Sequence, residues 1–360
     1  MKFRGLSRPL TLGFFMFMLV SAAPLDAQTA ALSERMTLPP AARLEGLTLV
    51  YQDVNRCSAA ALAIQLSYFE DTLAYSEAIR FLNPHAEDVA VRLDEMVAFA
   101  RSRGLGAIER VGGTPELLKA LIASDFPVLI ENSYYDGANY HRDWMSHNRV
   151  IMGYNDETRM FYAYDPLLGA GEDRLGRPIP YDDIETRWRP FNRDYMVVYR
   201  LEDEDRLRAV MGEHWDVVYN TEFALAQSLM ELESGVFDSF TYFNLGSSLA
   251  LLGRHEEAAE AFDRARANGL PWRMFWYQYG IFEAYYHTGR YDDMIALARD
   301  VIAATPGVEE VYYYAGLAYE AKGDLVRARG NYEVALWRNP SLLVASAGLA
   351  RLRGDGTVGG

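Results

Sequence analysis

The only cysteine of the chain, Cys57, is the first residue whose type and position could do chemistry. The residues after it are rich in alanine and leucine, which predicts a buried helix over about 57–71. Cys57 then falls in the first turn of that helix, where unpaired backbone N–H groups and the helix dipole stabilise an anion. Because the thiolate is the reactive form of cysteine, this placement indicates a candidate nucleophile. The alternative is an inert, buried free cysteine.

A histidine and an aspartate are expected to meet on a β-hairpin. Residues 148–154 and 159–164 are two strand-like runs joined by a turn over 155–158. His147 stands just before the first run and Asp165 just after the second, so their Cβ atoms should lie about 5 Å apart. An aspartate at that distance can fix the imidazole ring and stabilise its charged form. With Cys57, these two residues would complete an activated thiol nucleophile.

Each of these residues also has an ordinary structural explanation. His147 could be a strand-edge histidine, and Asp165 could simply open the turn that its Asp-Pro sequence favours. A metal site made of His141, Asp143 and His147 is a further alternative, but the spacing matches no familiar ligand pattern. We therefore expect neither a metal nor a cofactor.

Length and charge limit the classes of function. A chain of 360 residues favours two domains. The formal net charge is −15 and the sequence pI is about 4.9. Nucleic acid needs a basic surface, so we expect no nucleic-acid partner.

The first residues predict export. Lys2, Arg4 and Arg8 precede an apolar run over 10–23, which is 14 residues long and shorter than the roughly 20 that a membrane span needs. We therefore expect a signal peptide over 1–27, a loose leader or linker over 28–46 and an exported, periplasmic or extracellular protein without a span in its mature chain. An uncleaved anchor is the alternative. A lone cysteine in an exported chain cannot form an internal disulfide, which favours a reactive thiol.

The elements that must position these residues follow from periodicity and turn signals. Helices are expected over 75–82 and 93–103, the second ending at Gly104, and from Thr114 as N-cap through residue 122. Strands are expected over 47–51, 107–111 and 126–132, and a polar loop over 134–146.

From Leu47 to Arg200 the chain resembles papain-like cysteine peptidases of the bacteriocin-processing, double-glycine-leader type, and more closely their stand-alone exported relatives. The resemblance rests on Gln52 five residues before Cys57 and on four segments in the family's order: RLDEMVAFARSRGL, LLKALIASDFPVLIE, HNRVIMGYNDETRMFYAYDP and PYDDIETRWRPFNRDYMVVYR. It implies that Cys57 is the nucleophile, that His147 is the base and that Asp165 orients His147. It also implies that Gln52 and the Cys57 N–H form the oxyanion hole.

One departure from this family lies next to the cysteine. The family usually has Cys-Gly-Pro where this chain has Cys57, Ser58 and Ala59. Glycine there allows a substrate backbone to approach closely, and Ser58 carries a side chain. The substrate range, and whether the enzyme is weak or inactive, therefore stay open.

The second half is helical in pattern and contains a repeat. Gly289 and Gly323 lie 34 residues apart, as do Pro306 and Pro340. The period and the residues of the last copy resemble the tetratricopeptide repeat. By this resemblance a concave face would carry mostly aromatic side chains, namely Phe240, Phe243, Trp276, Tyr279, Glu283, Tyr286 and Tyr313. This face could hold a protein segment or could pack on the rest of the chain.

The predicted fold is an α+β papain-like cysteine peptidase domain followed by an all-α tetratricopeptide-repeat domain. The expected boundaries are 47–202 for the peptidase domain, 203–237 for a connecting or capping helix, 238–352 for the repeats and 353–360 for a disordered tail. The expected function is a cysteine peptidase that cleaves a peptide or protein substrate, with repeats that contact a protein partner. The alternatives are a non-catalytic binding or scaffold protein of the same fold and a cell-wall peptide hydrolase or acyltransferase.

Overall fold

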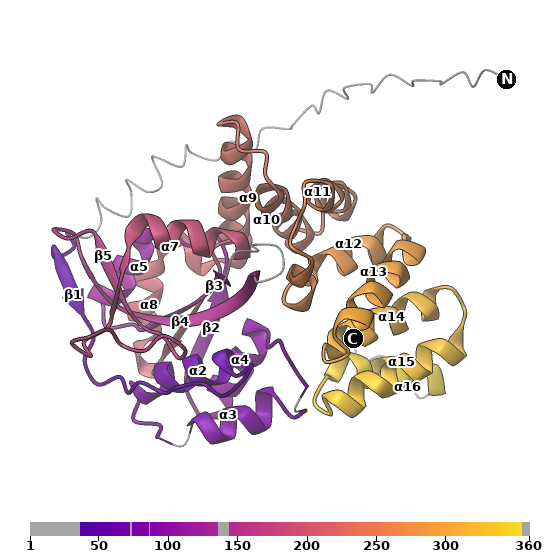
Figure 1. The fold of residues 1–360 in the computed structure, drawn as a ribbon, viewed down its shortest axis with the longest axis horizontal. Coiled ribbons are helices and arrows are strands. Elements are labelled where there is room, and N and C mark those ends of the chain that lie inside the picture. The colour runs from indigo at the N-terminus through magenta and orange to yellow at the C-terminus, as the bar shows by residue number, and fades with distance from the viewer. Residues whose placement is uncertain (1–36, 73, 86, 136–143, 355–360) are drawn as a thin grey trace.

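The chain folds into two parts that lie side by side (Figure 1). The structure is a computed structural model that describes residues 37–72, 74–85, 87–135 and 144–354. The first part is a sheet with helices on both faces, and the second is a curved succession of helices. The predicted signal peptide over 1–27, and His141 and Asp143 of the metal alternative, lie outside the described residues.

The sheet has seven strands, and every described pairing is antiparallel. Its order is β2-β7-β3-β4-β5-β6, and β1 pairs with the far end of β4. The bounds are Ala41–Arg43 for β1, Gly106–Arg110 for β2, Val128–Tyr135 for β3, Trp144–Asn155 for β4, Met160–Tyr164 for β5, Arg177–Pro180 for β6 and Tyr195–Tyr199 for β7.

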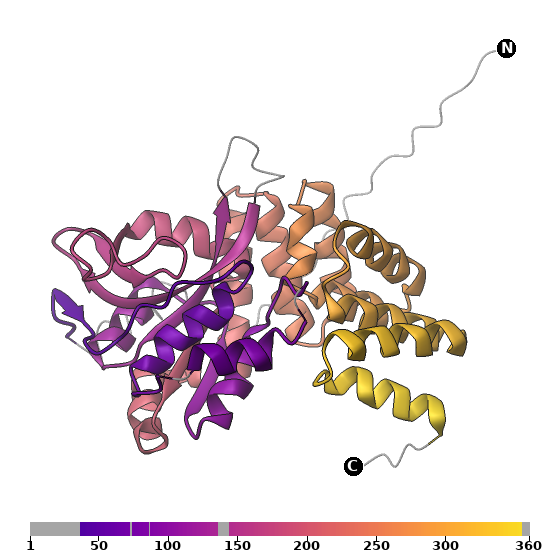
Figure 2. The same ribbon diagram turned by 60° about the horizontal axis from the view of Figure 1, so that its bottom comes forward.

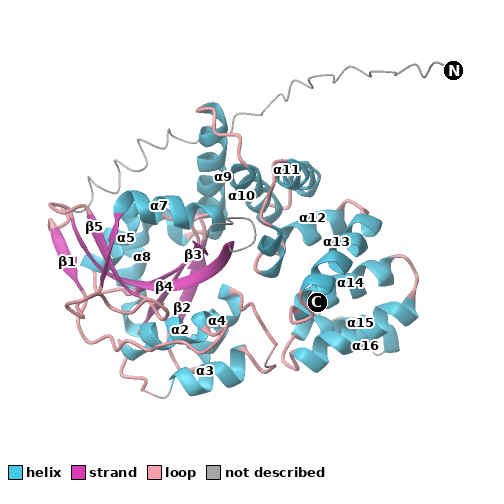
Figure 3. Cartoon of the chain, viewed as in Figure 1, coloured by secondary structure: helices cyan, strands magenta, loops and turns pink. Residues whose placement is uncertain are grey.

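Helices cover both faces of this sheet (Figure 3). Alternate residues of a strand face opposite sides, so Leu129 packs with the helices on one face while Val128 and Ile130 pack with those on the other. This arrangement confirms the expected combination of a sheet and helices in the first part of the chain. One face carries α2 (Cys57–Ser67), α3 (Ala74–Leu82) and α4 (Leu93–Ser102), and the other carries α5 (Pro115–Ala123), α7 (Tyr181–Trp188) and α8 (Glu204–Met211).

The helix ends follow the sequence signals closely. Thr114 caps α5, and its Oγ1 accepts a hydrogen bond from the Leu117 N–H at 3.1 Å. Gly104 follows the end of α4 with a φ of 82°, a conformation that glycine adopts without steric cost. Helix α8 falls in the predicted connecting segment but packs on the sheet part through Leu207 and Met211.

One predicted strand and two predicted loop segments differ from the structure. Residues 47–51 form no strand, because the Thr48 N–H donates to Ser67 Oγ at 2.7 Å and this segment crosses the end of α2. The leader predicted over 28–46 is not loose at its end, because Ala41–Arg43 forms β1. The polar loop predicted over 134–146 is also too long, since β3 extends to Tyr135 and β4 begins at Trp144.

The second part consists of consecutive helices that each pack on their neighbours (Figure 2). All seven strands precede Arg200, which confirms the change of pattern expected there. The tail predicted over 353–360 begins too early, because Arg353 closes the last helix; residues 355–360 lie outside the described residues. The helices are α9 (Val217–Glu233), α10 (Ser239–Leu251), α11 (His255–Ala267), α12 (Gly280–His287), α13 (Tyr291–Ala304), α14 (Glu309–Ala321), α15 (Leu325–Arg338) and α16 (Leu343–Arg353).

Trp144, at the start of β4, joins the two parts. It is completely buried and stacks on Phe191 of the first part at a ring-centroid distance of 5.5 Å. From the second part, the rings of Phe240 and Tyr277 lie 6.0 and 6.3 Å from it. The same apolar cluster continues through the helices, so one core spans the junction, while the sheet has two further cores of its own.

Polar contacts reinforce this junction. The Asn192 N–H donates to Asn244 Oδ1 at 3.1 Å, and Asn192 Nδ2 donates to Ser248 Oγ at 3.0 Å. Gln278 Nε2 donates to the buried carboxylate of Glu131 at 3.5 Å. The helical part therefore packs on the sheet part, which is one of the two arrangements considered for its concave face. Within the described ranges, no helix is both long and apolar enough to cross a bilayer.

Candidate active site

Helix α2 holds Cys57 at its first residue, as the sequence predicts. The alanine-rich run lets the helix pack closely, and Ser58 through Leu66 are all buried. Gln65 fixes the helix against the sheet, because its Nε2 donates to Pro127 O at 2.9 Å and to Met196 O at 3.0 Å. The thiol therefore lies at the positive end of a firmly anchored helix.

His147 lies between Cys57 and Asp165. Its Nε2 is 2.8 Å from Asp165 Oδ1, and both side chains are buried. The Cys57 thiol and the same ring lie close enough to shift each other's pKa, and because Nε2 faces Asp165, Nδ1 is the nitrogen left to face the thiol. The three residues predicted from the sequence are thus brought together in the order of a Cys–His–Asp arrangement.

The strand register differs in detail from the prediction. A bulge at Met152 interrupts the pairing of β4 with β5, and Val150 pairs with Tyr164. Continued by one residue, this register sets Asp165 opposite Arg149 rather than opposite His147. The carboxylate contacts both, because Arg149 Nε is 2.8 Å from its Oδ2. Arg149, only 5% exposed, was missed by the sequence argument.

The environment favours a charged Cys57–His147 pair. Burial of the thiol by itself would raise the pKa of Cys57, but the hydrogen bond to His147, the charge on that ring and a hydrogen bond from Asn148 lower it below its usual range. Burial likewise opposes the charged ring, yet the bonds to Asp165 and Cys57 raise the pKa of His147 to about 9. Burial opposes ionisation of Asp165 as well, but the contact with His147 and the charge of Arg149 hold the pKa of Asp165 well below its usual range.

Asn148 is a second residue that the sequence argument missed. Its Nδ2 lies 3.8 Å from Cys57 Sγ and donates to Ser58 Oγ at 3.1 Å. The Ser58 hydroxyl is therefore held toward β4 by a side chain of the same strand as His147. An asparagine directly after a candidate catalytic histidine is too common a pair of residues for sequence alone to single out.

We expect Asn148→Ala to shift the alkylation of Cys57 to higher pH, because the variant loses a donor that stabilises the thiolate. The shift should be smaller than that caused by removing His147, whose influence on the thiol is larger. The rate of reaction with iodoacetamide across pH measures it. Asn268→Ala, an exposed change on the helical part, is the matched control. An unchanged pH curve in Asn148→Ala would show that this donor does not act on the sulfur.

Gln52 lies beside the loop that carries Asp165. Its backbone N–H donates to Pro166 O at 2.9 Å, which ties the segment before α2 to the end of the hairpin. Its side-chain Oε1 is buried without a hydrogen-bond partner among the described residues. No hydrogen bond in that part of the chain joins Gln52 to Cys57, so its predicted role at the oxyanion stays a prediction.

Tyr277 brings the helical part to the site. It follows the short helix η4 (Trp272–Trp276), and its ring packs near Trp144. Burial, followed by the charge of the Cys57 thiolate, raises the pKa of Tyr277, while a hydrogen bond from the backbone of Ser146 opposes this. The phenol therefore lies next to the residue that precedes His147 and within electrostatic reach of the thiol.

The predicted aromatic groove is only partly open. Phe243 is 1% exposed and packs on Phe262 at 5.1 Å, so the prediction that it lines a groove is wrong. Trp276 and Tyr286 are half-buried. Tyr279 and Tyr313 instead line a cavity of about 730 Å³ between the two parts.

Comparison with known proteins addresses the first part of the chain. Residues 39–196 match the family described as Peptidase_C39 like. This match supports a papain-like peptidase domain in the first part, here called the C39-like domain. It ends just before the helical part, for which the tetratricopeptide prediction stays untested.

Two solved structures are similar to the C39-like domain. One is a double glycine motif protease from an AMS/PCAT transporter in complex with the leader peptide, with 17% identity, a TM-score of 0.32 and coverage of 44% of this chain and 94% of that one. The other is a C39-like peptidase from Bacillus anthracis, with 15% identity, a TM-score of 0.36 and coverage of 44% and 96%. None of the curated proteins matches the chain.

Proposed function

We propose that this chain is a cysteine peptidase that cleaves peptide bonds through a thiol acyl-enzyme. The observation that carries the proposal is that His147 lies within electrostatic reach of the Cys57 thiol while its Nε2 is 2.8 Å from the buried Asp165 carboxylate. The match of the C39-like domain to a peptidase family supports the same reaction class.

In the proposed mechanism the Cys57 thiolate attacks the carbonyl carbon of the scissile bond. His147, held as an imidazolium by Asp165, gives its proton to the leaving amine and then accepts one from the water that releases the acyl group. The Cys57 N–H at the start of α2 and the Gln52 side chain would donate to the oxyanion. Tyr277 would border the substrate on the side of the helical part.

We also make proposals about the export of the protein and about its helical part. We infer that the protein is exported by the basic and apolar N-terminal segment over 1–27. We also infer that the helical part consists of tetratricopeptide repeats, supported by its successive helices that pack on one another and by its 34-residue period. A protein partner of these repeats would bind outside the surface that packs on the C39-like domain.

Cleavage of a complex peptide mixture tests the proposed reaction. The full chain and its Cys57→Ala variant are incubated with the mixture in H₂¹⁸O, and new peptide termini are read by mass spectrometry. We expect new termini that carry ¹⁸O in their carboxylates with the wild type and none with Cys57→Ala. Products that join two peptides without ¹⁸O would instead identify an acyltransferase. The absence of any product, together with an unreactive thiol, would favour a non-catalytic binding protein.

Gln52→Ala is expected to lower kcat by about 10²–10³-fold, because one oxyanion donor is lost. KM should change little, since this interaction forms mainly in the transition state. The rate of Cys57 alkylation by iodoacetamide should stay close to that of the wild type, because that reaction creates no oxyanion. Equal losses in alkylation and in peptide cleavage would mean that Gln52 supports the fold of the site instead.

A further inference from the structure

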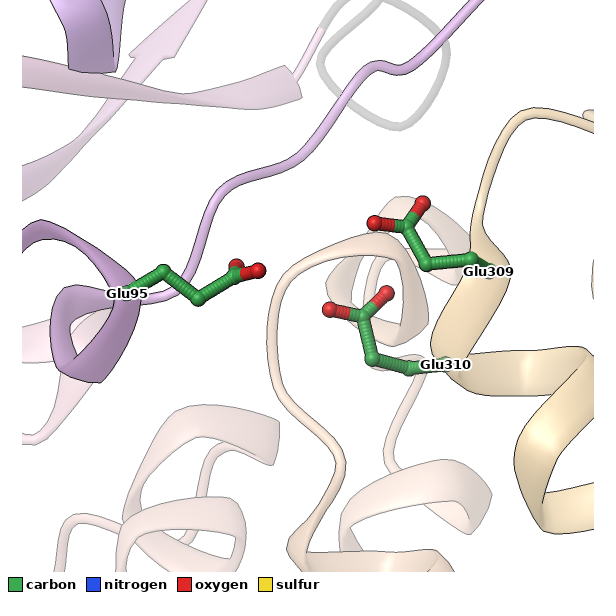
Figure 4. A group of neighbouring side chains, drawn as sticks. All are labelled: Glu95, Glu309 and Glu310. Atoms are coloured by element: carbon green, nitrogen blue, oxygen red, sulfur yellow. The ribbon is translucent and has the colours of Figure 1, made fainter. Parts of the chain in front are cut away.

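Three carboxylates from the two parts of the chain meet at the junction (Figure 4). Glu95 comes from α4 of the C39-like domain, while Glu309 and Glu310 open α14. One carboxylate oxygen from each of the three residues lies within 4.8 Å of the other two. Glu309 and Glu310 are 2% and 1% exposed, and Asp88, also 2% exposed, lies close enough to act on their charges.

Protein donors reach all three carboxylates. Glu95 Oε2 accepts from the Arg92 N–H at 3.0 Å, and Glu309 Oε1 accepts from Asn339 Nδ2 at 2.9 Å. Asn339 Nδ2 also donates to Glu95 Oε1 at 3.3 Å, so both oxygens of Glu95 accept a hydrogen bond. These donors orient the carboxylates from the rim of the cluster.

Glu310 has a buried carboxylate oxygen that no donor in the described part of the chain satisfies. Its Oε2 accepts from Tyr279 OH at 3.2 Å, but its Oε1 is buried and has no hydrogen-bond partner among the described residues. The carboxylate points into the space between the three side chains. The nearest positive group is Arg92, whose Nη1 is 3.7 Å from that oxygen.

The local charges do not balance. Asp88 lies within electrostatic reach of Glu309 and Glu310. Arg92, the guanidinium beside Glu310, is also engaged by Asp94. The amino end of α14 offsets only part of this excess of acidic groups. Buried carboxylates need a cation or a full set of donors, because water no longer solvates them. An oxygen-lined, anionic space of this kind is what a hard divalent cation prefers.

We propose that Glu95, Glu309 and Glu310 bind a Ca²⁺ ion that links the helical part to the C39-like domain. Ca²⁺ accepts oxygen ligands at about 2.3–2.6 Å, so two ligands on opposite sides can lie about 5 Å apart. Mg²⁺ needs about 2.0–2.1 Å and strict octahedral geometry, which would draw the three side chains closer together. The site is distinct from the Cys57 site and does not depend on the proposed peptidase activity.

Luminescence of Tb³⁺, which replaces Ca²⁺ and is excited through nearby tyrosine, tests the site in the full chain. Tyr279 contacts Glu310, so bound Tb³⁺ should give a saturable signal that Ca²⁺ displaces. We expect Glu309→Gln and Glu310→Gln to weaken Tb³⁺ binding at least about tenfold, since each removes one of three anionic ligands. Glu333→Gln, an exposed change on α15, should leave binding unchanged.

Thermal unfolding provides the second readout and covers variants that fold poorly. Millimolar Ca²⁺ should raise the Tm of the metal-free wild type and should leave that of Glu309→Gln/Glu310→Gln unchanged. Tb³⁺ emission that persists in the double variant would reflect surface carboxylates and would overturn the proposal. A wild-type Tm that does not change on addition of Ca²⁺ would also overturn the proposal. It would mean that bound protons neutralise the carboxylates.

Discussion

His147→Ala should abolish the unusual reactivity of Cys57 and lower peptide cleavage at least about 10³-fold. The thiolate loses the hydrogen bond and the positive charge that lower its pKa, whereas the burial that raises the pKa remains. A thiol with an ordinary pKa of about 8.5 is only about 1% ionised at pH 6.5. At that pH we therefore expect the alkylation rate of the variant to fall at least about tenfold below that of the wild type.

The pH dependence separates this explanation from simple loss of packing. In the wild type the thiolate–imidazolium pair should exist between the lowered pKa of Cys57 and the raised pKa of His147, about 9. Cleavage should decline above that value as His147 loses the proton that the leaving amine needs. His287→Ala, an exposed histidine of the helical part, is the control and should match the wild type. Equal alkylation rates for His147→Ala and wild type at pH 6.5 would contradict the assignment.

Asp165→Ala should destabilise the fold by about 3–5 kcal/mol, the usual cost of removing one partner of a buried ion pair. Asp165 is completely buried, and the change leaves the Arg149 guanidinium and the His147 ring without their shared carboxylate. The N–H groups of Leu167 and Leu168 lose their acceptor as well. Cleavage should fall together with stability, because His147 loses the group that orients it.

Denaturant unfolding followed by circular dichroism measures this loss. Asp182→Ala removes an exposed ion pair with Arg159 and should cost only about 0–1 kcal/mol. The Asp165–His147 contact adds a pH signature. His147 stabilises the wild type fully below its ordinary pKa of 6.5, and this contribution is lost as the pH rises through about 9. The difference in free energy of unfolding between the wild type and Asp165→Ala should therefore become smaller above that pH. A difference that stays constant with pH would mean that the stability is lost through the contact with Arg149 and not through the contact with His147.

The sequence predicts the parts of the site that depend on local signals. An alanine-rich helix after a cysteine, and two strands joined by a short turn, are local patterns, and they place Cys57, His147 and Asp165 correctly. The caps at Thr114 and Gly104 are equally local. The contact of His147 with Asp165 survives the bulge at Met152 because the two side chains reach diagonally across the strands.

The remaining contacts depend on long-range packing that no local signal encodes. Glu131 and Ser133 are polar residues buried in β3, where Glu131 meets Gln278 of the helical part. Tyr277 reaches the site only because η4 packs against β4. For the same reason, Phe243 resembles a groove residue in a repeat pattern but lies in the shared core.

The burial of Trp144 between the two parts has a consequence for how the chain folds. Its indole is surrounded by Phe191 from one part and by Phe240 and Tyr277 from the other, so neither part alone completes that core. An excised C39-like domain would expose this aromatic cluster a few residues from His147. The two parts should accordingly unfold as one cooperative unit. The helical part then serves as an intramolecular subunit of the C39-like domain rather than as a detachable adaptor.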